Sequence, residues 1–265
     1  MEISAFAALV LGIVEGLTEF LPISSTGHLI ITSSLLDLHG PKVLAFEIII
    51  QGAAILAVCW EYRRLLWKTT VSIARDAGAQ RFALNIFLGF LPLAVLGLAF
   101  QAQIEEFLFR PVPVAIALVI GGIAILWVDR RHGAQPTLDT VEAVPVRTAI
   151  VLGLWQALAL IPGTSRAGAT IIGGVWLGMS RRLATEYSFF LAIPTLIGAT
   201  VYKLYEGRDL FIAADLVPFT IGAVVAFITA LLAVRGFIRF ISTHSFAAFG
   251  WYRIVFGVIV LLIPW

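Results

Sequence analysis

The longest uncharged stretch of this chain is the feature that most limits how it can fold. Residues Phe82 to Ile104 form a run of 23 residues without Asp, Glu, Lys or Arg. About 20 apolar residues are enough for a helix to cross the hydrocarbon core of a membrane. Over the whole chain 60% of the residues are hydrophobic and only 13% are charged, whereas a soluble domain carries about 25% charged residues. The sequence therefore predicts an all-α integral membrane protein.

Five further segments have the length and composition of membrane spans, and three of them contain one ionisable residue each. With Phe82–Ile104 they predict six transmembrane helices. The five segments are Val43–Trp60 with Glu47, Val112–Val128, Glu186–Tyr202 with Glu186, Leu216–Val234, and Phe246–Trp265 with Arg253.

Two other apolar stretches are interrupted near their centres. Residues 5–37 are broken by Pro22 and a Ser-Ser-Thr-Gly run, and residues 148–180 by Ile-Pro-Gly-Thr-Ser-Arg. Each half is about 15 residues long, which is too short to cross a membrane, so we expect two re-entrant helix–loop–helix pairs. Irregular backbone at membrane depth is tolerated only where protein or a wet cavity satisfies it. Both breaks are therefore expected to line one cavity.

The two interrupted stretches also resemble each other. VLGIVEGL at 10–17 matches VLGLWQAL at 151–158, and the same offset places Ser24 over Ser165. Each half of the chain then holds one re-entrant pair and three spans, and because three is odd the second half is inverted relative to the first. We expect one membrane domain of two inverted repeats, about 1–131 and about 146–265. Such repeats usually bind their ligand at the repeat interface.

The distribution of positive charge predicts how this topology is oriented. Twelve lysines and arginines fall on one side and four on the other, and the richer side is expected to be cytoplasmic. A basic cytoplasmic linker then covers 130–147, while both termini and the loops at 102–111 and 203–215 face outward. The twelve are Arg63, Arg64, Lys68, Arg75, Arg81, Arg130, Arg131, Arg147, Arg181, Arg182, Arg235 and Arg239; the four are Lys42, Arg110, Lys203 and Arg208.

Both breaks carry groups that suit phosphate. A helix that restarts after a break presents free backbone N–H groups, which favour an anion. Arg166 adds a planar guanidinium that matches phosphate oxygens. For the hydroxyl residues, above all Ser24 and Thr164, capping of the following helix is the alternative role. The candidate phosphate-binding residues are Ser24, Thr26, Gly27, Thr164, Ser165 and Arg166.

The remaining polar residues of the first break indicate chemistry as well as binding. Glu15 and Glu19 are four apart and share a helix face, so they can hold Mg²⁺ or Ca²⁺, or one can act as a base. Ser25 is the candidate nucleophile, and His28, one turn further on, can exchange protons with it or instead bond a neighbouring helix. Three more residues either surround the site or lie near a membrane face: Glu47, Gln51 and Glu186. The role of Arg253 stays open.

Four segments together resemble a known family. They are EGLTEFLPISSTGHL at 15–29, FEIIIQ at 46–51, PGTSRAGAT at 162–170 and ATEYSFFLAIP at 184–194. In this order they resemble the bacterial undecaprenyl pyrophosphate phosphatases of the bacitracin-resistance type. One departure is Ala167, where the family commonly has a serine.

The resemblance implies hydrolysis of the C55 lipid pyrophosphate to the monophosphate and phosphate, which recycles the carrier for peptidoglycan synthesis. It also implies a divalent cation, an active site facing outward from the bacterial inner membrane, a homodimer and no nucleic-acid partner. By position, the family's acidic pair corresponds to Glu15 and Glu19, its nucleophile to Ser25, its histidine to His28 and its arginine to Arg166.

Two questions stay open at this point. Ser25 can attack phosphorus itself, or a metal-activated water can attack while Ser25 only binds phosphate. Inverted repeats with broken helices are also the architecture of secondary transporters, so a transporter or flippase of a polyprenyl phosphate is the alternative function.

Overall fold

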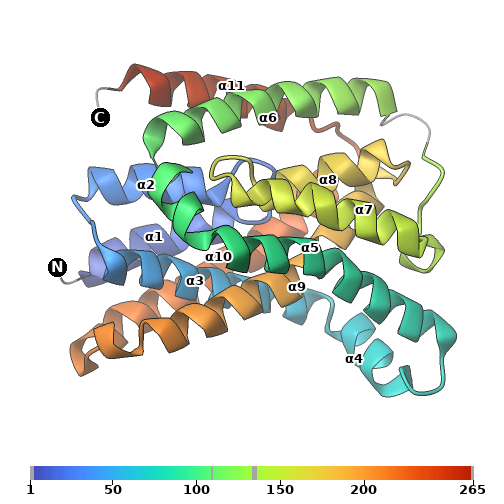
Figure 1. The fold of residues 1–265 in the computed structure, drawn as a ribbon, viewed down its shortest axis with the longest axis horizontal. Coiled ribbons are helices and arrows are strands. Elements are labelled where there is room, and N and C mark those ends of the chain that lie inside the picture. The colour runs from blue at the N-terminus through green and yellow to red at the C-terminus, as the bar shows by residue number, and fades with distance from the viewer. Residues whose placement is uncertain (1–2, 109, 133–135, 264–265) are drawn as a thin grey trace.

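The computed structural model describes residues 3–108, 110–132 and 136–263, without the side chains of 101–103, 105–107 and 132. The regular elements in this part of the chain are helices, and one isolated β-bridge joins Leu138 and Met179 (Figure 1). The α-helices are α1 Ala5–Thr18, α2 Ser25–Leu35, α3 Pro41–Glu61, α4 Arg63–Ser72, α5 Ala77–Leu108, α6 Pro111–His132, α7 Val146–Ala157, α8 Arg166–Trp176, α9 Arg181–Glu206, α10 Leu216–Ile241 and α11 Ala247–Leu262. Four 3-10 helices complete the set: η1 Val141–Ala143, η2 Leu158–Leu160, η3 Arg208–Leu210 and η4 Ala213–Asp215.

Five of the described helical segments are long and apolar enough to cross a membrane. They contain α3, α5, α6, α9 and α10, and each covers one predicted span. The sixth predicted span, Phe246–Trp265, is a shorter helix: α11 has 16 residues, or about 24 Å at 1.5 Å per residue, against a hydrocarbon core of about 30 Å. Residues 264–265 of that prediction lie outside the described part. By length and composition, the described part of the structure thus contains five candidate spans.

The two interrupted stretches form the predicted helix–break–helix pairs. α1 and α2 have 14 and 11 residues, and α7 and α8 have 12 and 11. α2 and α8 begin in the same way: Ser24 and Ser165 have φ values of 72° and 70°, and their hydroxyls accept the N–H groups of Gly27 and Gly168. The residues matched in sequence are therefore matched N-caps.

The short helices pack across the two halves of the chain. α1 lies along α10, and α7 lies along α5, so each pairs with a long helix of the other half. Both crossings are glycine contacts: a Cβ on Gly12 would lie 2.6 Å from the carbonyl oxygen of Gly222, and one on Gly153 would lie 2.6 Å from that of Gly89. Backbones approach this closely only where both helices carry small residues. The outermost pair is α6 and α11.

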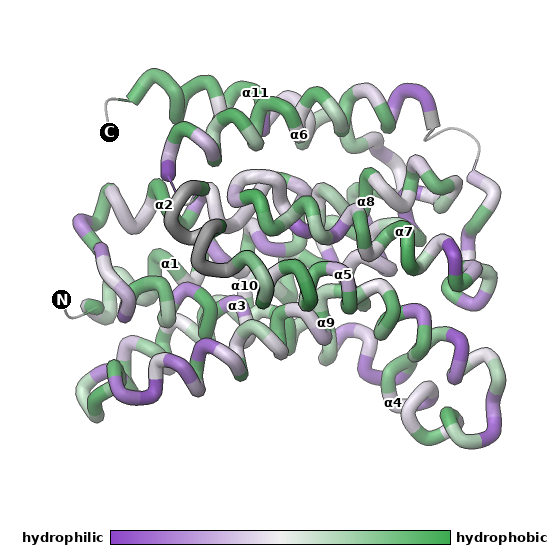
Figure 2. Tube along the Cα trace, viewed as in Figure 1, coloured by the Kyte–Doolittle hydropathy of each residue, from purple (hydrophilic) through white to green (hydrophobic). Residues whose placement is uncertain are grey.

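The loops separate into two ends of the molecule. The start of α1, the end of α11 and the turns η3 and η4 lie at one end, while α4 and the linker between α6 and α7 lie at the other (Figure 1). Hydrophobic residues predominate along the long helices between these ends (Figure 2). Residues 133–135 of the predicted linker, and residues 1–2 and 264–265 of the predicted outward termini, are outside the description.

Candidate active site

Both breaks open onto one cavity of about 550 Å³, as the sequence predicted. Its walls away from the breaks are largely apolar and come from α3, α5, η2 and α9. The cavity extends to Tyr202 and Lys203 near the end of α9, and therefore toward the end of the molecule that holds both chain ends. Its polar lining residues are Glu19, Ser24, Ser25, Thr26, Glu47, Gln51, Ser165, Arg166, Thr195 and Lys203.

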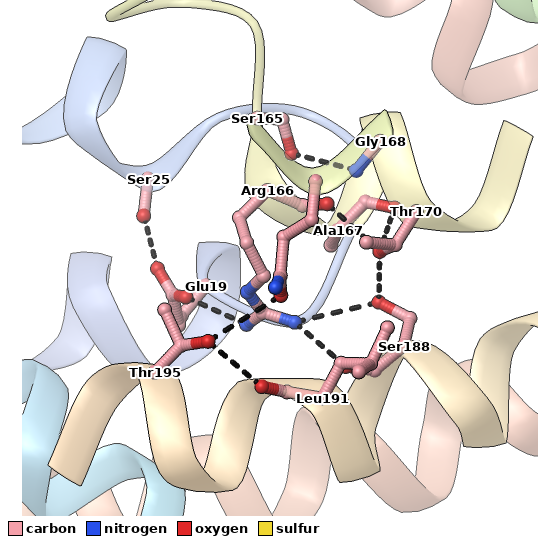
Figure 3. A network of polar contacts seen from close by, with 11 residues as sticks. Glu19, Ser25, Ser165, Arg166, Ala167, Gly168, Thr170, Ser188, Leu191 and Thr195 are labelled. Atoms are coloured by element: carbon pink, nitrogen blue, oxygen red, sulfur yellow. Dashed lines mark hydrogen bonds and ion pairs between the residues drawn. The ribbon is translucent and has the colours of Figure 1, made fainter. Parts of the chain in front are cut away.

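The centre of the polar part is a buried carboxylate with two partners (Figure 3). Ser25 Oγ donates a hydrogen bond to Glu19 Oε2, and Arg166 Nη2 donates to Glu19 Oε1 at 2.7 Å. None of the three residues is more than 9% exposed. Glu19 follows the last turn of α1, Ser25 opens α2 and Arg166 opens α8. The two helix breaks are thus joined through one carboxylate.

Hydroxyl residues of α8 and α9 hold the Arg166 guanidinium from its other side (Figure 3). Arg166 Nη1 donates to the carbonyl oxygen of Ser188 at 3.1 Å and to its hydroxyl at 3.4 Å. Thr170 Oγ1 in turn donates to Ser188 Oγ at 2.6 Å. Ser188 and Thr170 were not among the predicted site residues, because in the second repeat only residues at the break itself were considered for phosphate binding. Both residues lie within the segments that resemble the family. A hydroxyl group inside an otherwise apolar helix is the sequence feature that could have marked them as site residues.

Glu15 lies one helical turn before Glu19 but, unlike Glu19, its carboxylate has no hydrogen-bond partner among the described residues. The backbone N–H of Glu19 donates to the carbonyl oxygen of Glu15 at 2.9 Å, so the two side chains share a face as predicted. The Glu15 side chain is 0% exposed, and neither carboxylate oxygen has a hydrogen-bond partner among the described residues. A buried, unpartnered carboxylate is costly unless it is neutralised by a proton or a cation.

Glu15 and Glu19 offer a minimal set of carboxylate donors for a divalent cation, and of the two only Glu19 lines the cavity. The described residues contain no group of three or more His, Cys, Asp or Glu side chains arranged to hold a metal. Mg²⁺, however, commonly takes only one or two carboxylates and completes its shell with water and substrate phosphate oxygens. The orphan oxygens of Glu15, with Glu19 beside them, supply that minimum.

The hydroxyls at the two breaks divide into caps and cavity residues. Ser24 and Ser165 cap α2 and α8, but both also line the cavity, together with Thr26. Thr164 and Gly27 are not among the described lining residues. The carbonyl oxygen of Thr164 accepts from Arg253. The helix starts therefore face the cavity, as expected for anion binding.

The ring of His28 contacts groups other than the Ser25 hydroxyl in this structure. Its Nδ1 is 2.7 Å from the carbonyl oxygen of Ser24, its Nε2 is 2.7 Å from the hydroxyl of Tyr252, and its ring stacks on Phe256. It is absent from the described cavity lining. The geometry does not support the predicted proton exchange with Ser25, because both ring nitrogens are engaged elsewhere. It matches the alternative of a helix–helix hydrogen bond.

The three residues predicted to surround the site separate into two places. Glu47 and Gln51 line the cavity, and Glu47 accepts a hydrogen bond of 2.6 Å from Ser33. Glu186 instead lies beside Tyr62 at the far end of α3 and pairs with Arg182 at 3.1 Å. Of the two alternatives for Glu186, the structure matches the one away from the cavity, because the start of α9 lies beside the end of α3.

Comparison with known proteins agrees with this geometry. The family model described as bacitracin resistance protein BacA matches residues 8–259. The chain belongs to this family. Among its relatives, an undecaprenyl-diphosphatase of Janthinobacterium sp. is 55% identical over 263 residues, which cover 98% of this chain and 95% of the relative. One from Nitrosospira multiformis is 56% identical over 254 residues (96% and 93%), and undecaprenyl-diphosphatase 1 of Pseudomonas fluorescens is 53% identical over 258 (97% and 93%).

Proposed function

We propose that this protein hydrolyses undecaprenyl pyrophosphate to undecaprenyl phosphate and inorganic phosphate. The observation that carries the proposal is the buried Ser25–Glu19–Arg166 arrangement at the polar end of an otherwise apolar cavity. A nucleophile, a base and a phosphate-binding cation lie together there. The apolar walls suit the prenyl chain next to the headgroup. Family membership and the names of the relatives support the substrate.

The Glu19 contacts suggest how the reaction begins. The terminal phosphate binds Arg166 and the N–H groups that open α2 and α8, and it displaces Glu19 from the guanidinium. Glu19 then takes the proton of Ser25, whose Oγ attacks the terminal phosphorus as the bond to the bridging oxygen breaks. Undecaprenyl phosphate leaves with that oxygen. The proton that Glu19 took from Ser25 passes to the departing undecaprenyl phosphate, so Glu19 is a carboxylate again. Water then attacks the phosphorus of the phosphoserine and gives one proton to Glu19. As the bond from phosphorus to Ser25 Oγ breaks, Glu19 returns that proton to Oγ and phosphate is released.

Charge neutralisation is expected to supply much of the rate, as in other phosphoryl transfers. Arg166 contributes one positive charge, and the two helix starts contribute partial positive charge. Glu15 and Glu19 carry the oxygen donors for a Mg²⁺ or Ca²⁺ ion, whose chemistry when bound is to neutralise the pyrophosphate oxygens.

For the membrane arrangement we propose six crossings, with α11 as the sixth, and two re-entrant pairs in an inverted repeat. The matched caps of α2 and α8 and the matched crossings of α1 with α10 and α7 with α5 support this arrangement. Positive charge outside the spans favours the end with α4 as the cytoplasmic side. The cavity then opens toward the outer face of the bacterial inner membrane.

Phosphate release from undecaprenyl pyrophosphate by the purified protein in detergent tests the function. We expect turnover that EDTA abolishes and Mg²⁺ or Ca²⁺ restores, and Ser25→Ala is expected to abolish it while Ser72→Ala, on exposed α4, does not. Trapping a phosphoserine at residue 25 would establish the attack by serine. Substantial turnover by Ser25→Ala would instead favour attack by water. No release with any divalent cation, together with transfer of undecaprenyl phosphate across vesicles, would make the protein a flippase.

A further inference from the structure

Arg253 of α11 is fully buried, and its guanidinium is held entirely by backbone oxygens. Its side chain is 0% exposed, and no carboxylate pairs with it among the described residues. An arginine has five N–H donors, and here each has an acceptor. Nε donates to Leu118 O at 3.3 Å, Nη1 to Pro22 O at 3.2 Å and Thr164 O at 2.9 Å, and Nη2 to Ala117 O at 3.2 Å and Gly163 O at 2.9 Å.

Three of these acceptors lie in the two helix breaks. Pro22 is three residues before Ser25, and Gly163 is three residues before Arg166. The repeat offset that relates Ser24 to Ser165 also relates Pro22 to Gly163, so one side chain binds equivalent carbonyls of both repeats. The other two acceptors belong to α6, which packs along α11. Arg253 thus ties both breaks to the same helix pair.

The surroundings are shaped for this guanidinium. A Cβ on Gly121 would lie 2.1 Å from Arg253 Nη2, and a Cβ on Gly168 would lie 2.9 Å from Nη1. Real Cβ atoms do not approach other atoms so closely, so an alanine at 121 must displace the guanidinium. That substitution is on α6, outside the cavity lining.

α11 also holds α2 through side chains next to Arg253. Tyr252 is hydrogen-bonded to His28 Nε2, and Phe256 stacks on the His28 ring with centroids 4.4 Å apart. His28 follows Ser25 by one turn of α2. α11 therefore contacts the first break before and after the proposed nucleophile.

We propose that Arg253 is a positioning residue that fixes the separation of the two breaks, so that Ser25 and Arg166 face one phosphate group. Arg253 is not among the cavity lining residues and acts only through the backbone that it binds. Its role in the reaction rests on the proposed phosphatase function. Its effect on the two breaks does not.

The test uses Arg253→Met, which removes all five donors, Arg253→Lys, which keeps the charge and three donors, and Gly121→Ala. Gly236→Ala is the control, because a Cβ there meets nothing within 4 Å. Since a displacement of about 1 Å can cost about 100-fold in rate, we expect Arg253→Met to lower kcat about 100-fold with KM little changed. Arg253→Lys is expected to be intermediate, and Gly121→Ala is expected to lower kcat while leaving residue 253 intact.

Hydrogen exchange of the backbone supplies a readout independent of activity. In Arg253→Lys and Gly121→Ala we expect faster exchange at the backbone amides of residues 23–27 and 163–168, with exchange in α9 unchanged. Wild-type kcat in folded Arg253→Met and Gly121→Ala would overturn the proposal, as would loss of folded protein in all three variants, which would make Arg253 a folding residue. A wild-type protein that releases no phosphate would refute the phosphatase function, whereas the exchange experiment would still decide whether Arg253 fixes the breaks.

Discussion

Glu19 is the residue on which the two halves of the site converge. One carboxylate oxygen of Glu19 accepts a hydrogen bond from Ser25 and the other accepts one from Arg166. Without substrate, Glu19 is therefore bonded both to the proposed nucleophile and to the arginine proposed to bind phosphate. A phosphate that binds Arg166 removes one of these partners and leaves the carboxylate free to accept the Ser25 proton. In the proposed mechanism, this contact couples substrate binding to activation of Ser25.

Glu19→Gln tests that coupling. The amide has nearly the same shape and still accepts one hydrogen bond, but it cannot take a proton. General-base catalysis contributes about 10²- to 10⁴-fold, so we expect kcat for phosphate release to fall by that factor. Glu142→Gln, on the exposed linker, is the matched control and is expected to keep the wild-type rate. If Glu19→Gln kept the wild-type kcat, a group other than Glu19 would have to accept the proton of Ser25.

At the scale of elements, glycine contacts decide how closely the short helices approach their long partners. Gly12 of α1 and Gly153 of α7 each face a carbonyl oxygen of a long helix across equivalent crossings. These crossings fix the positions of α1 and α7. Because each break directly follows one of these helices, the crossings also help to position the two breaks.

Gly12→Ala and Gly153→Ala are expected to destabilise the protein, because each new Cβ would lie 2.6 Å from a backbone oxygen. Overpacking of this kind costs about 1–3 kcal/mol, and we expect thermal denaturation in detergent to show a lower Tm for both. Gly236→Ala in α10 has open space around its Cβ and gains helix propensity of about 1 kcal/mol, so its Tm is expected to be unchanged or higher. Equal Tm values in all three variants would contradict this expectation and show that α1 and α10, and α7 and α5, can move apart without loss of stability.

At the scale of the whole molecule, the separation of the loops makes the proposed orientation testable. Thr140, just before η1 in the linker, and Asp209 in η3 are both exposed. The linker and η3 lie at opposite ends of the molecule (Figure 1). In a Cys59→Ser background, we expect Asp209→Cys to react with a membrane-impermeant maleimide in intact cells. Thr140→Cys is expected to react only after the inner membrane is permeabilised. The reverse pattern would place the cavity mouth in the cytoplasm.

Much of the architecture could be predicted from the sequence because it depends on local properties. Apolar runs of span length with at most one ionisable residue predicted the five long helices, and internal similarity predicted that Ser24 and Ser165 occupy matched positions at the two breaks. The same signal predicted a sixth span, whose helix α11 has only 16 residues in the structure. Arg166 was identified as a candidate site residue because it lies at the second break and its planar guanidinium matches phosphate oxygens.

The partners of individual polar side chains were decided only by the tertiary structure. His28, Glu186 and Arg253 each carry a charge or titrate, and the sequence offered several roles for each. Their partners lie on helices that meet only in the folded chain: His28 with Tyr252, and Arg253 with Pro22, 231 positions away. The sequence by itself determined a helical membrane protein with two broken repeats, since hydrophobic length and backbone breaks are local. Only the tertiary structure decided which polar groups share the cavity, because that depends on how distant helices cross.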